Sequence, residues 1–570
     1  MNRKFYWLLA ALFFVISCRE QTAKIEQKKI VTGVLAKNGM VVSAHPLATQ
    51  VGLDILKNGG NAFDAAIAVQ YALAVVLPKA GNIGGGGFLV YRKSDGETGS
   101  LDFREKAPIA AHKDMYLDGE GNPISSLSKR GHLAAGVPGT VAGMDETFKK
   151  FGSLPFEKLI QPSIDLAANG FLLTEYEAGL LNRFQDSFKE VNNGPIYLNK
   201  DTEFVEGDSI YHKDLAKTLT LIRDNGRDGF YKGETALLIE KEMKKGGGII
   251  SQEDLANYQA TWRDPIEVTY KNDYKIISMP PSSSGGVALA QLMLGSAQYD
   301  FKQMGLNTAK SIHVMTELQR RVYADRATHL GDMDFYDVPI EMLLGEAYLL
   351  ERYSTISLDS ATLSQEIKAG EVKTIESFET THFSIVDKEG NAVSVTTTLN
   401  SYFGCKVLVE GAGFFLNNEM DDFSVKPGVP NQFGLVGAEA NAIQPGKRML
   451  SSMTPTIVEK NGKLFIVVGT PGGSTIITNV YQVILNVLEH GLSMQEAVDA
   501  KKMHSQWLPD QIIVEQGLDS LMLDSLRAMG HSIREIEQIG RIEAILLRED
   551  GMLEGAADVT RTGDATAMGY

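Results

Sequence analysis

The sequence is poor in the residues that build disulfides and metal sites. Only two of its 570 residues are cysteines, Cys18 and Cys405. If Cys18 is modified, as argued below, no internal disulfide is possible, and stability must come from packing. No motif surrounds Cys405, so we expect it to fill space in the core. The ten histidines include no His-Glu-x-x-His pattern and no cluster with cysteine, so the sequence predicts neither a metal site nor another cofactor.

Positive charge is also scarce. Lysine and arginine number 55 against 71 aspartates and glutamates, which gives a net charge of −16. Because no dense run of basic residues alternates with aromatics, nucleic acid is not an expected partner. A hydrophobic content of 44% and a charged content of 22% are typical of a globular chain with a large core.

A nucleotide site is not indicated either, although residues 81–87 contain five glycines. This run follows an apolar helical stretch that Pro78 ends, and it leads into a strand. A dinucleotide site needs the order strand, glycines, helix, and a phosphate loop needs a Gly-Lys-Ser/Thr sequence that is absent. We therefore expect these glycines to allow close packing of the backbone.

The first residues are typical of an export signal. Arg3 and Lys4 precede the apolar run 5–16, which is too short to span a membrane. The run ends at Val15-Ile16-Ser17-Cys18, which resembles a bacterial lipobox. We expect a signal peptide over 1–17, a lipid on Cys18 and a polar tether up to residue 38, with order beginning near Gly39. A plain secretory signal with an incidental cysteine is the alternative.

The lipobox also suggests where the protein resides. Arg19 stands where many lipoproteins kept at an inner membrane carry aspartate. The expected location is therefore the bacterial cell envelope, with attachment to the outer membrane facing the periplasm.

The apolar spacing predicts two helices near the start of the chain and several hairpins after residue 380. The first helix ends at Asn58-Gly59-Gly60 and the second covers 62–77. Residues 88–92 and 100–104 form a predicted hairpin across Asp95-Gly96. Further hairpins join 383–386 to 392–398, and 455–458 to 464–468, and a third turns at 549–551. Helices are expected over 312–327, 479–488 and 494–502. Hairpins covered by helices predict a layered α+β architecture.

Thr380 opens the segment that carries the most chemical information. A threonine at a chain terminus can act as a nucleophile, because its own α-amine titrates near pH 7.7–8 and can serve as the base. This requires cleavage of the Glu379–Thr380 bond. Taken alone, Thr380 and Thr381 would simply be β-branched residues at the start of a strand.

The surrounding residues change that interpretation. The sequences Thr380-Thr381-His382-Phe383-Ser384 and Asp387-Lys388-Glu389-Gly390-Asn391-Ala392-Val393 resemble the start of the small subunit of γ-glutamyltransferases. Further motifs follow the family order over nearly the whole mature chain. They are Asn58-Gly59-Gly60-Asn61-Ala62, Gly81 to Phe88, Asp102-Phe103-Arg104-Glu105, Val137-Pro138-Gly139, Leu416 to Ser424 and Gly469 to Ser474.

This resemblance implies the four-layer αββα sandwich of N-terminal nucleophile hydrolases. It also implies a large subunit over 39–379 and a small catalytic subunit over 380–570, which together form one intertwined unit. The expected reaction is attack of Thr380 on a γ-glutamyl carbonyl, followed by release of the ester to water or to an amino acid or peptide acceptor. Glutathione would be a donor.

Roles are carried over from the family motif by motif. Thr398 would bind the amine of Thr380, and Gly472 and Gly473 would stabilise the oxyanion. Arg104 would pair with the substrate carboxylate, helped by Ser451 and Ser452. Asn400, Glu419 and Asp422 would hold the substrate ammonium. The segment 427–441 resembles a lid, in which Phe433 stands where relatives often have tyrosine.

Two other functions remain open at this stage. A glutaryl-cephalosporin acylase shares the fold and the nucleophile, and a non-catalytic lipoprotein could bind a ligand on the same scaffold. The intact set of Thr380, Thr398, Arg104, Asp422 and the glycine pair favours an active enzyme.

Overall fold

Two seven-stranded antiparallel sheets form the centre of the protein. Sheet 1 has the strand order β19 (Thr566–Gly569), β2 (Met40–Ser43), β10 (Thr381–Val386), β11 (Ala392–Thr398), β3 (Gly86–Arg92), β4 (Thr98–Asp102) and β7 (Thr261–Arg263). Sheet 2 has the order β1 (Val34–Ala36), β18 (Leu553–Ala557), β17 (Glu543–Leu547), β13 (Lys463–Gly469), β12 (Thr456–Lys460), β9 (Tyr274–Ser278) and β8 (Ile266–Tyr270).

The structure is a computed structural model that describes residues 30–367, 380–558 and 565–570. Residues 32–570 form one compact unit. The predicted signal peptide, Cys18 and Glu379 lie outside the described residues. Among the helices that are described, none is long and apolar enough to cross a membrane.

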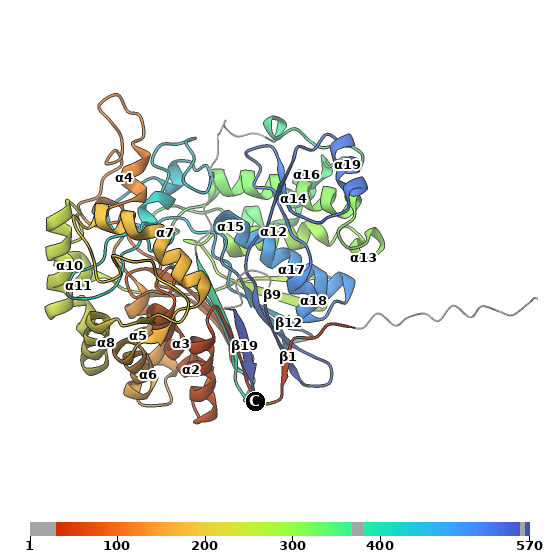
Figure 1. Ribbon diagram of the computed structural model, residues 1–570. Coiled ribbons are helices and arrows are strands. Elements are labelled where there is room, and N and C mark those ends of the chain that lie inside the picture. The colour runs from red at the N-terminus through yellow and green to blue at the C-terminus, as the bar shows by residue number, and fades with distance from the viewer. Residues whose placement is uncertain (1–29, 368–379, 559–564) are drawn as a thin grey trace, which may run out of the picture. The chain divides into compact units, whose positions relative to one another are not determined.

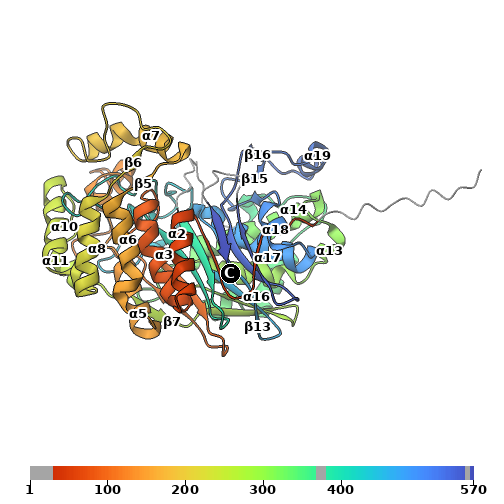
Figure 2. The same cartoon turned by 60° about the horizontal axis from the view of Figure 1, so that its bottom comes forward.

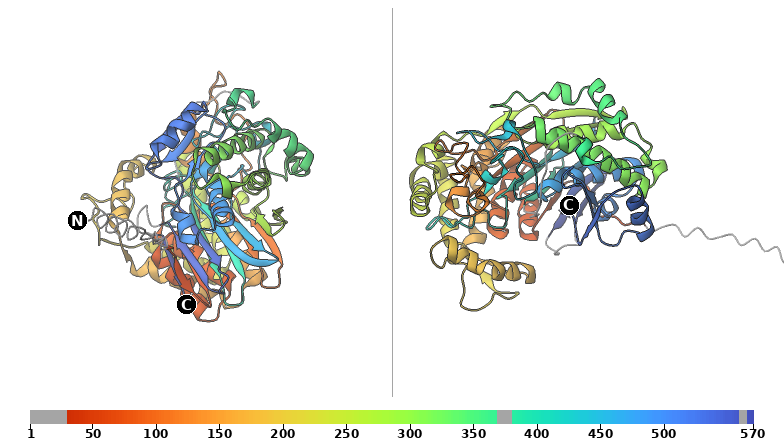
Figure 3. Two further views of the ribbon diagram at one scale, coloured as in Figure 1. Left: turned by 90° about the vertical axis from the view of Figure 1, so that its right-hand side faces the viewer. Right: turned by 90° about the horizontal axis from the view of Figure 1, so that it is seen from above.

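Helices cover the outer faces of both sheets (Figures 1 and 2). Sheet 1 is covered by α2 (Pro46–Lys57) and α3 (Ala62–Val76), with α5 (Thr140–Phe151) and α6 (Phe156–Asn169) beyond them. Sheet 2 is covered by α12 (Gly285–Ser296), α14 (Ala309–His329), α17 (Ile476–His490) and α18 (Met494–Asp499). Figure 3 shows the same two groups of helices on opposite sides of the sheets. The predicted αββα sandwich is therefore confirmed.

The remaining α-helices and strands of the described residues lie around this sandwich. They are the helices α4 (Ser125–Lys129), α7 (Glu175–Val191), α8 (Lys213–Asn225), α9 (Asp228–Tyr231), α10 (Gly233–Gly246), α11 (Gln252–Asn257), α13 (Phe301–Met304), α15 (Ile340–Leu343), α16 (Glu346–Ser354) and α19 (Ser520–Ala528), and the strands β5 (Phe171–Leu172), β6 (Ser209–Ile210), β14 (Met503–His504), β15 (Ile512–Glu515) and β16 (Ile533–Ile536). Strands β14 to β16 form a separate small sheet.

Helix α3 shows how the sequence sets the outer layer. The Asn61 side chain accepts hydrogen bonds from the N–H groups of Phe63 and Asp64, and Asp64 accepts from the N–H of Asn61, which completes a capping box. All fifteen residues of the helix are buried, and Pro78 follows its end. The predicted helix, apolar on every side, is thus the inner helix of the layer that covers sheet 1.

The hairpin β10–β11 has two different faces, and both are buried. Phe383 and Val395 pack toward the helices with the largest core cluster. The hydroxyl groups of Ser384, Ser394 and Thr396 lie between the two sheets, where Ser394 donates to the carbonyl of Val468 in sheet 2. These hydroxyl groups thus share one face of the hairpin and satisfy polar atoms inside the sandwich rather than facing solvent.

The glycine run 81–87 brings backbone segments into direct contact. A Cβ atom on Gly85 would lie 2.0 Å from the carbonyl oxygen of Thr398, and one on Gly84 would lie 2.1 Å from that of Phe415. No side chain fits at such distances. The predicted packing role of this run is confirmed.

Four details differ from the predictions. Order begins before Gly39, because Val34–Ala36 pairs with β18 inside the expected tether. Strand β4 ends at Asp102, two residues before Arg104, and β10 begins at Thr381. Strands β7 to β9 were not predicted. Strands β1 and β7 acquire their partners from distant parts of the chain, which local patterns do not show, whereas β8 and β9 pair with each other as a local hairpin.

Candidate active site

One pocket gathers nearly all of the predicted site residues. About 300 Å³ of space lies between its lining residues, part of it open to solvent. It is lined by Thr380, Thr398, Asn400, Arg104, Glu419, Asp422, Phe433, Ser451, Ser452 and Gly473, by Leu435 of the predicted lid segment, and by three residues not predicted, Arg326, Met453 and Ile476. Among the described site residues, Gly472 is the one that does not line it.

Thr380 and Thr398 reach this pocket from adjacent strands. Thr380 directly precedes β10, and Thr398 is the last residue of β11, which pairs with β10. The backbone N–H of Asn400 donates to the Thr398 hydroxyl over 2.7 Å. Asn400 itself has a φ of +72°, a conformation that asparagine tolerates better than most residues, and its side chain donates to the carbonyl of Asn418. The sharp turn after β11 therefore places both residues at the pocket.

Arg104 is buried at one side of the pocket among three carboxylates. Its guanidinium lies 2.7 Å from Glu419 and 2.6 Å from Asp422, and 3.5 Å from Glu105. Glu419 and Asp422 belong to a short 3-10 turn, Glu419–Asp422. The residues expected to hold a substrate carboxylate and a substrate ammonium thus pair with each other in this structure.

The charges of this cluster perturb one another. Burial raises the pKa of Glu105 to about 7 and raises that of Glu419 well above its ordinary value, although Arg104 opposes both shifts. Burial alone would lower the pKa of Arg104, but Glu419, Glu105 and Asp422 together raise it. Near neutral pH the cluster therefore retains at least one proton on Glu105 or Glu419 while Arg104 stays charged.

Arg326 is a second cation at the pocket that the sequence analysis missed. It lies on α14 and is buried, and its guanidinium donates to the hydroxyls of Ser284 (2.9 Å) and Ser452 (3.2 Å). Burial lowers its pKa to about 10, so it remains charged at neutral pH. No local pattern identifies it, because Ser452 lies 126 residues away in the sequence.

The predicted glycine pair lies between β13 and α17. Gly472 and Gly473 have φ angles of +143° and +53°, which favour glycine. A Cβ on Gly473 would lie 2.7 Å from the ring of Phe433. The pair therefore begins the turn into α17 at the edge of the pocket.

The predicted lid segment, 427–441, lies over the same pocket. Asn431 donates to Asp422 over 3.0 Å, the N–H of Gln432 donates to Asp421 over 2.8 Å, and Gln506 donates to the carbonyl of Phe433 over 3.1 Å. Phe433 is buried. The tip of the lid is thus held by residues beside the carboxylates of the pocket.

Cys405 does not belong to this site. It is buried, its Sγ donates to the carbonyl of Leu416, and burial raises its pKa to about 12. It is a neutral thiol in the core, as expected.

A threonine, an arginine and a set of carboxylates around one small pocket of an αββα sandwich define an acyl-transfer enzyme of the N-terminal nucleophile hydrolase type. The chain belongs to the γ-glutamyltranspeptidase family, which residues 48–568 match. It is 46% identical over 539 residues to the glutathione hydrolase proenzyme of Escherichia coli, with 94% of this chain and 93% of the relative covered.

Two solved structures place the chain within this family and its neighbours. The Helicobacter pylori γ-glutamyltranspeptidase is 46% identical, with a TM-score of 0.56 over 61% of this chain and 97% of the other. The cephalosporin acylase of Bacillus halodurans is 26% identical, with a TM-score of 0.81 over 95% of this chain and 97% of the other. The acylase shares the fold over a longer stretch, but its sequence is less similar.

The protonated carboxyl behind the pocket predicts a pH effect. The folded protein keeps the proton of Glu105 up to about pH 7, because its pKa is raised to about 7, whereas a glutamate in the unfolded chain loses its proton near the ordinary pKa of 4.5. The stabilisation of the folded state by protonated Glu105 is therefore complete below about pH 4.5 and is lost as the pH rises through about 7. Glutamine mimics the protonated form, so Glu105→Gln should gain in melting temperature over the wild type between pH 5 and pH 8.

Thermal unfolding of the ligand-free protein at a series of pH values measures this difference. The matched control is Glu120→Gln, which removes the same charge from an exposed loop. A difference between Glu105→Gln and the wild type that stays constant from pH 5 to pH 8 would contradict the assignment.

Proposed function

We propose that the protein is an autoprocessing γ-glutamyltransferase and glutathione hydrolase whose nucleophile is Thr380. One observation carries this proposal: Thr380 lines the same small pocket as Arg104 and Asp422. A terminal threonine supplies the reactive group, and a cation beside an anion suits the α-carboxylate and α-ammonium of a γ-glutamyl donor.

Self-cleavage would create the active site. The Thr380 hydroxyl attacks the carbonyl carbon of Glu379, the C–N bond breaks, and the acyl group moves to oxygen. Water then hydrolyses the ester, which leaves a carboxylate on Glu379 and a free α-amine on Thr380. The products would be a large subunit ending at Glu379 and a small subunit over 380–570, held together as a heterodimer.

Turnover would use the same groups. The Thr380 oxygen attacks the γ-carbonyl while its α-amine, hydrogen-bonded by Thr398, takes the proton. N–H groups at Gly472 and Gly473 would stabilise the oxyanion. The leaving amine takes the proton back, and a γ-glutamyl ester remains on Thr380. Water, or an amino acid or peptide acceptor, releases the γ-glutamyl group by the reverse sequence.

Substitution of the nucleophile tests this proposal. Thr380→Ala should remain one uncut polypeptide without activity, because the variant lacks the attacking oxygen. Thr380→Ser should process slowly. A denaturing gel with N-terminal sequencing of the smaller product measures both, and the wild type should give a product that begins at Thr380. Cleavage at another bond, or a cut Thr380→Ala chain, would refute the assignment.

The glutaryl-cephalosporin acylase remains the second candidate, since the Bacillus halodurans acylase shares the fold. A glutaryl group lacks the α-ammonium, so a carboxylate at position 422 has no cation to bind in that case. Losing a charge-assisted hydrogen bond costs about 1.5–3 kcal/mol, which corresponds to roughly one to two decades in kcat/KM.

Asp422→Asn should therefore lower kcat/KM for γ-glutamyl-p-nitroanilide by at least about tenfold but should not lower kcat/KM for glutaryl-p-nitroanilide. Asp421→Asn is the matched control, because it removes a carboxylate one position away that binds Ser128 and the lid instead. Its effect should be equal for both substrates. Equal losses in Asp422→Asn, or a wild-type preference for the glutaryl substrate, would favour the acylase.

We further propose that a lipid on Cys18 anchors the enzyme to the outer membrane, facing the periplasm. The lipobox pattern and Arg19 support this location. Cys18→Ala should move the protein from the membrane fraction to the soluble fraction, whereas Cys405→Ala, which changes the other cysteine, should not. Membrane fractionation that is the same for Cys18→Ala and the wild type would exclude this anchor.

A further inference from the structure

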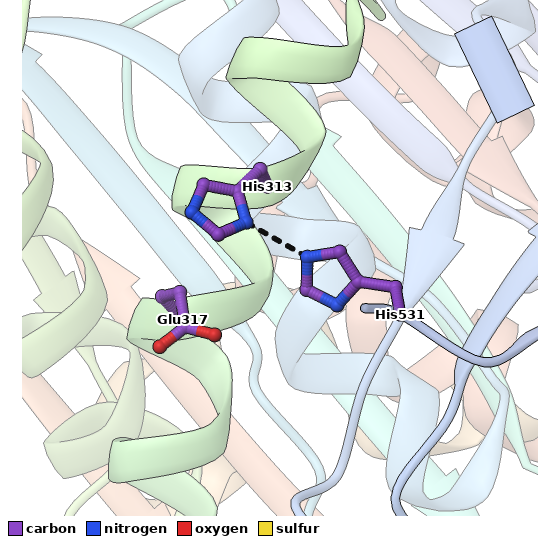
Figure 4. A group of neighbouring side chains, drawn as sticks. All are labelled: His313, Glu317 and His531. Carbon is purple, nitrogen blue, oxygen red and sulfur yellow. Dashed lines mark hydrogen bonds between the residues drawn. The ribbon is translucent and has the colours of Figure 1, made fainter. Parts of the chain in front are cut away.

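A second cluster of buried charged residues lies away from the pocket, between α14 and the C-terminal part of the chain. Glu317 of α14 pairs with Arg321 over 2.7 Å and with Arg320 over 3.3 Å. Arg320 also lies 2.6 Å from Asp510. His313, one turn before Glu317, meets His531. Figure 4 shows His313, Glu317 and His531 facing one another.

Residues of this cluster form hydrogen bonds with the segment 361–364. The N–H of Thr362 donates to Glu317 over 3.0 Å, and its carbonyl and hydroxyl accept from Arg320 and Arg321 respectively. The N–H of Ser364 donates to Asp510 over 2.8 Å. All three polar groups of Thr362 are thus bonded to α14, and the N–H of Ser364 is bonded to Asp510.

Further bonds come from the C-terminal side. The Ser364 hydroxyl donates to the carbonyl of Trp507 over 2.7 Å, and the Trp507 indole donates back to the carbonyl of Ser364 over 3.0 Å. The N–H of Ala361 donates to the carbonyl of Met529 over 2.8 Å. The segment is therefore bonded to residues on both sides of position 380.

The two histidines and Glu317 also have the composition of a metal site, and their ligand atoms lie within 4.8 Å of one another. Two features argue against a cation there. The guanidinium groups of Arg320 and Arg321 already neutralise Glu317, and they would repel a further positive charge. The imidazole nitrogens also have partners that do not require an ion.

The hydrogen bonds determine which nitrogen of each imidazole ring carries the proton. His313 Nε2 lies 2.7 Å from the carbonyl of Ser357, which can only accept, so Nε2 carries the proton and Nδ1 accepts. His531 Nε2, 2.7 Å from that Nδ1, then donates. Nδ1 of His531 faces a guanidinium nitrogen of Arg320 at 3.5 Å. Burial and Arg320 lower the pKa of His531 to about 4, which agrees with a neutral ring.

We propose that this cluster positions the scissile bond for self-cleavage and afterwards holds the end of the large subunit against the small one. We call it the α14 joint; it consists of His313, Glu317, Arg320, Arg321, Asp510 and His531. The proposal rests on the proposed cleavage before Thr380. Residues 313–364 would then belong to the large subunit, and Trp507, Asp510, Met529 and His531 to the small one. Arg320 and Asp510 are positioning residues, since they do not line the pocket.

The number of residues between the α14 joint and Thr380 determines how much the joint should accelerate self-cleavage. The joint holds the chain up to Ile367, so 12 residues, 368–379, connect it to Thr380. Without the joint, the connection would extend back to the end of α16 at Ser354, which gives 25 residues, 355–379. Doubling a loop lowers the probability of bringing its ends together by about threefold. Self-cleavage should slow by this factor.

Asp510→Asn is the test variant, because Asp510 is partly exposed and binds both Arg320 and Ser364. Asp524→Asn is the matched control, since it removes an exposed partner of Arg527 on the nearby helix α19. Asp510→Glu keeps the charge and should restore most of the function. Half-times of self-cleavage are measured on denaturing gels, and hydrogen exchange of the peptide covering 361–367 is measured by mass spectrometry.

Asp510→Asn removes only the contacts of Asp510, so we expect cleavage to slow by up to about threefold and the amides of 361–364 to exchange faster. The kcat and KM values of the fully processed enzyme should be unchanged within about twofold. An unaltered half-time and unaltered exchange would overturn the proposal. Fast exchange of these amides in the processed wild type would overturn it even if Asp510→Asn failed to fold.

Measurements on the wild type distinguish the α14 joint from a metal site and from an uncut protein. Stoichiometric metal in the purified wild type would overturn the hydrogen-bond arrangement assigned here. A wild type that is never cut before Thr380 would refute the proposed function, whereas a normally cut wild type with an unaffected Asp510→Asn would refute only the joint.

Discussion

The rest of the site depends on the ion pairs that the buried guanidinium of Arg104 forms with Glu419 and Asp422. Arg104 belongs to the segment after β4, while Glu419 and Asp422 come from beyond Thr380. Removing one partner from a buried ion pair leaves an uncompensated charge, which is strongly destabilising. The buried charges before the proposed cleavage point are therefore neutralised by charges after it, and neither part of the chain can bury its own charges alone. A chain that folded first and was cut later would satisfy this requirement, because all partners are present in one polypeptide.

Backbone contacts impose a second constraint, and it comes from glycine. The carbonyl of Thr398 lies where a Cβ of residue 85 would be, and Asn82 donates to the same carbonyl over 2.9 Å. The end of β11 is thus fixed by contacts with the glycine run rather than by its own side chains. Since Asn400 follows two residues later, the position of the pocket wall depends on glycines more than 300 residues earlier in the chain.

Local features of the fold could be predicted from the sequence, and distant pairings could not. The capped apolar helix at Asn61 and the β10–β11 hairpin carry their signals within a few residues. The β8–β9 hairpin is local as well, because only residues 271–273 separate its strands, and Lys271 and Asn272 of this turn have positive φ angles; no motif predicted it. By contrast, β1 pairs with β18 from the other end of the chain, and Arg326 of α14 meets Ser452 from 126 residues away. Family motifs supplied the remaining site residues, whose grouping no spacing could show.

The pairing of Arg104 with Asp422 has a consequence for how a γ-glutamyl donor would enter. In this structure the two groups neutralise each other at 2.6 Å, and Asn431 of the lid occupies another oxygen of Asp422. A donor with both a carboxylate and an ammonium can replace this single ion pair with two, one to Arg104 and one to Asp422. A ligand with only a carboxylate would separate Arg104 from Asp422 and leave the latter without a cation. Because the ion pair is largely buried, that loss is not recovered from solvent. The arrangement thus favours zwitterions, because they break the same buried ion pair but give both Arg104 and Asp422 a new partner.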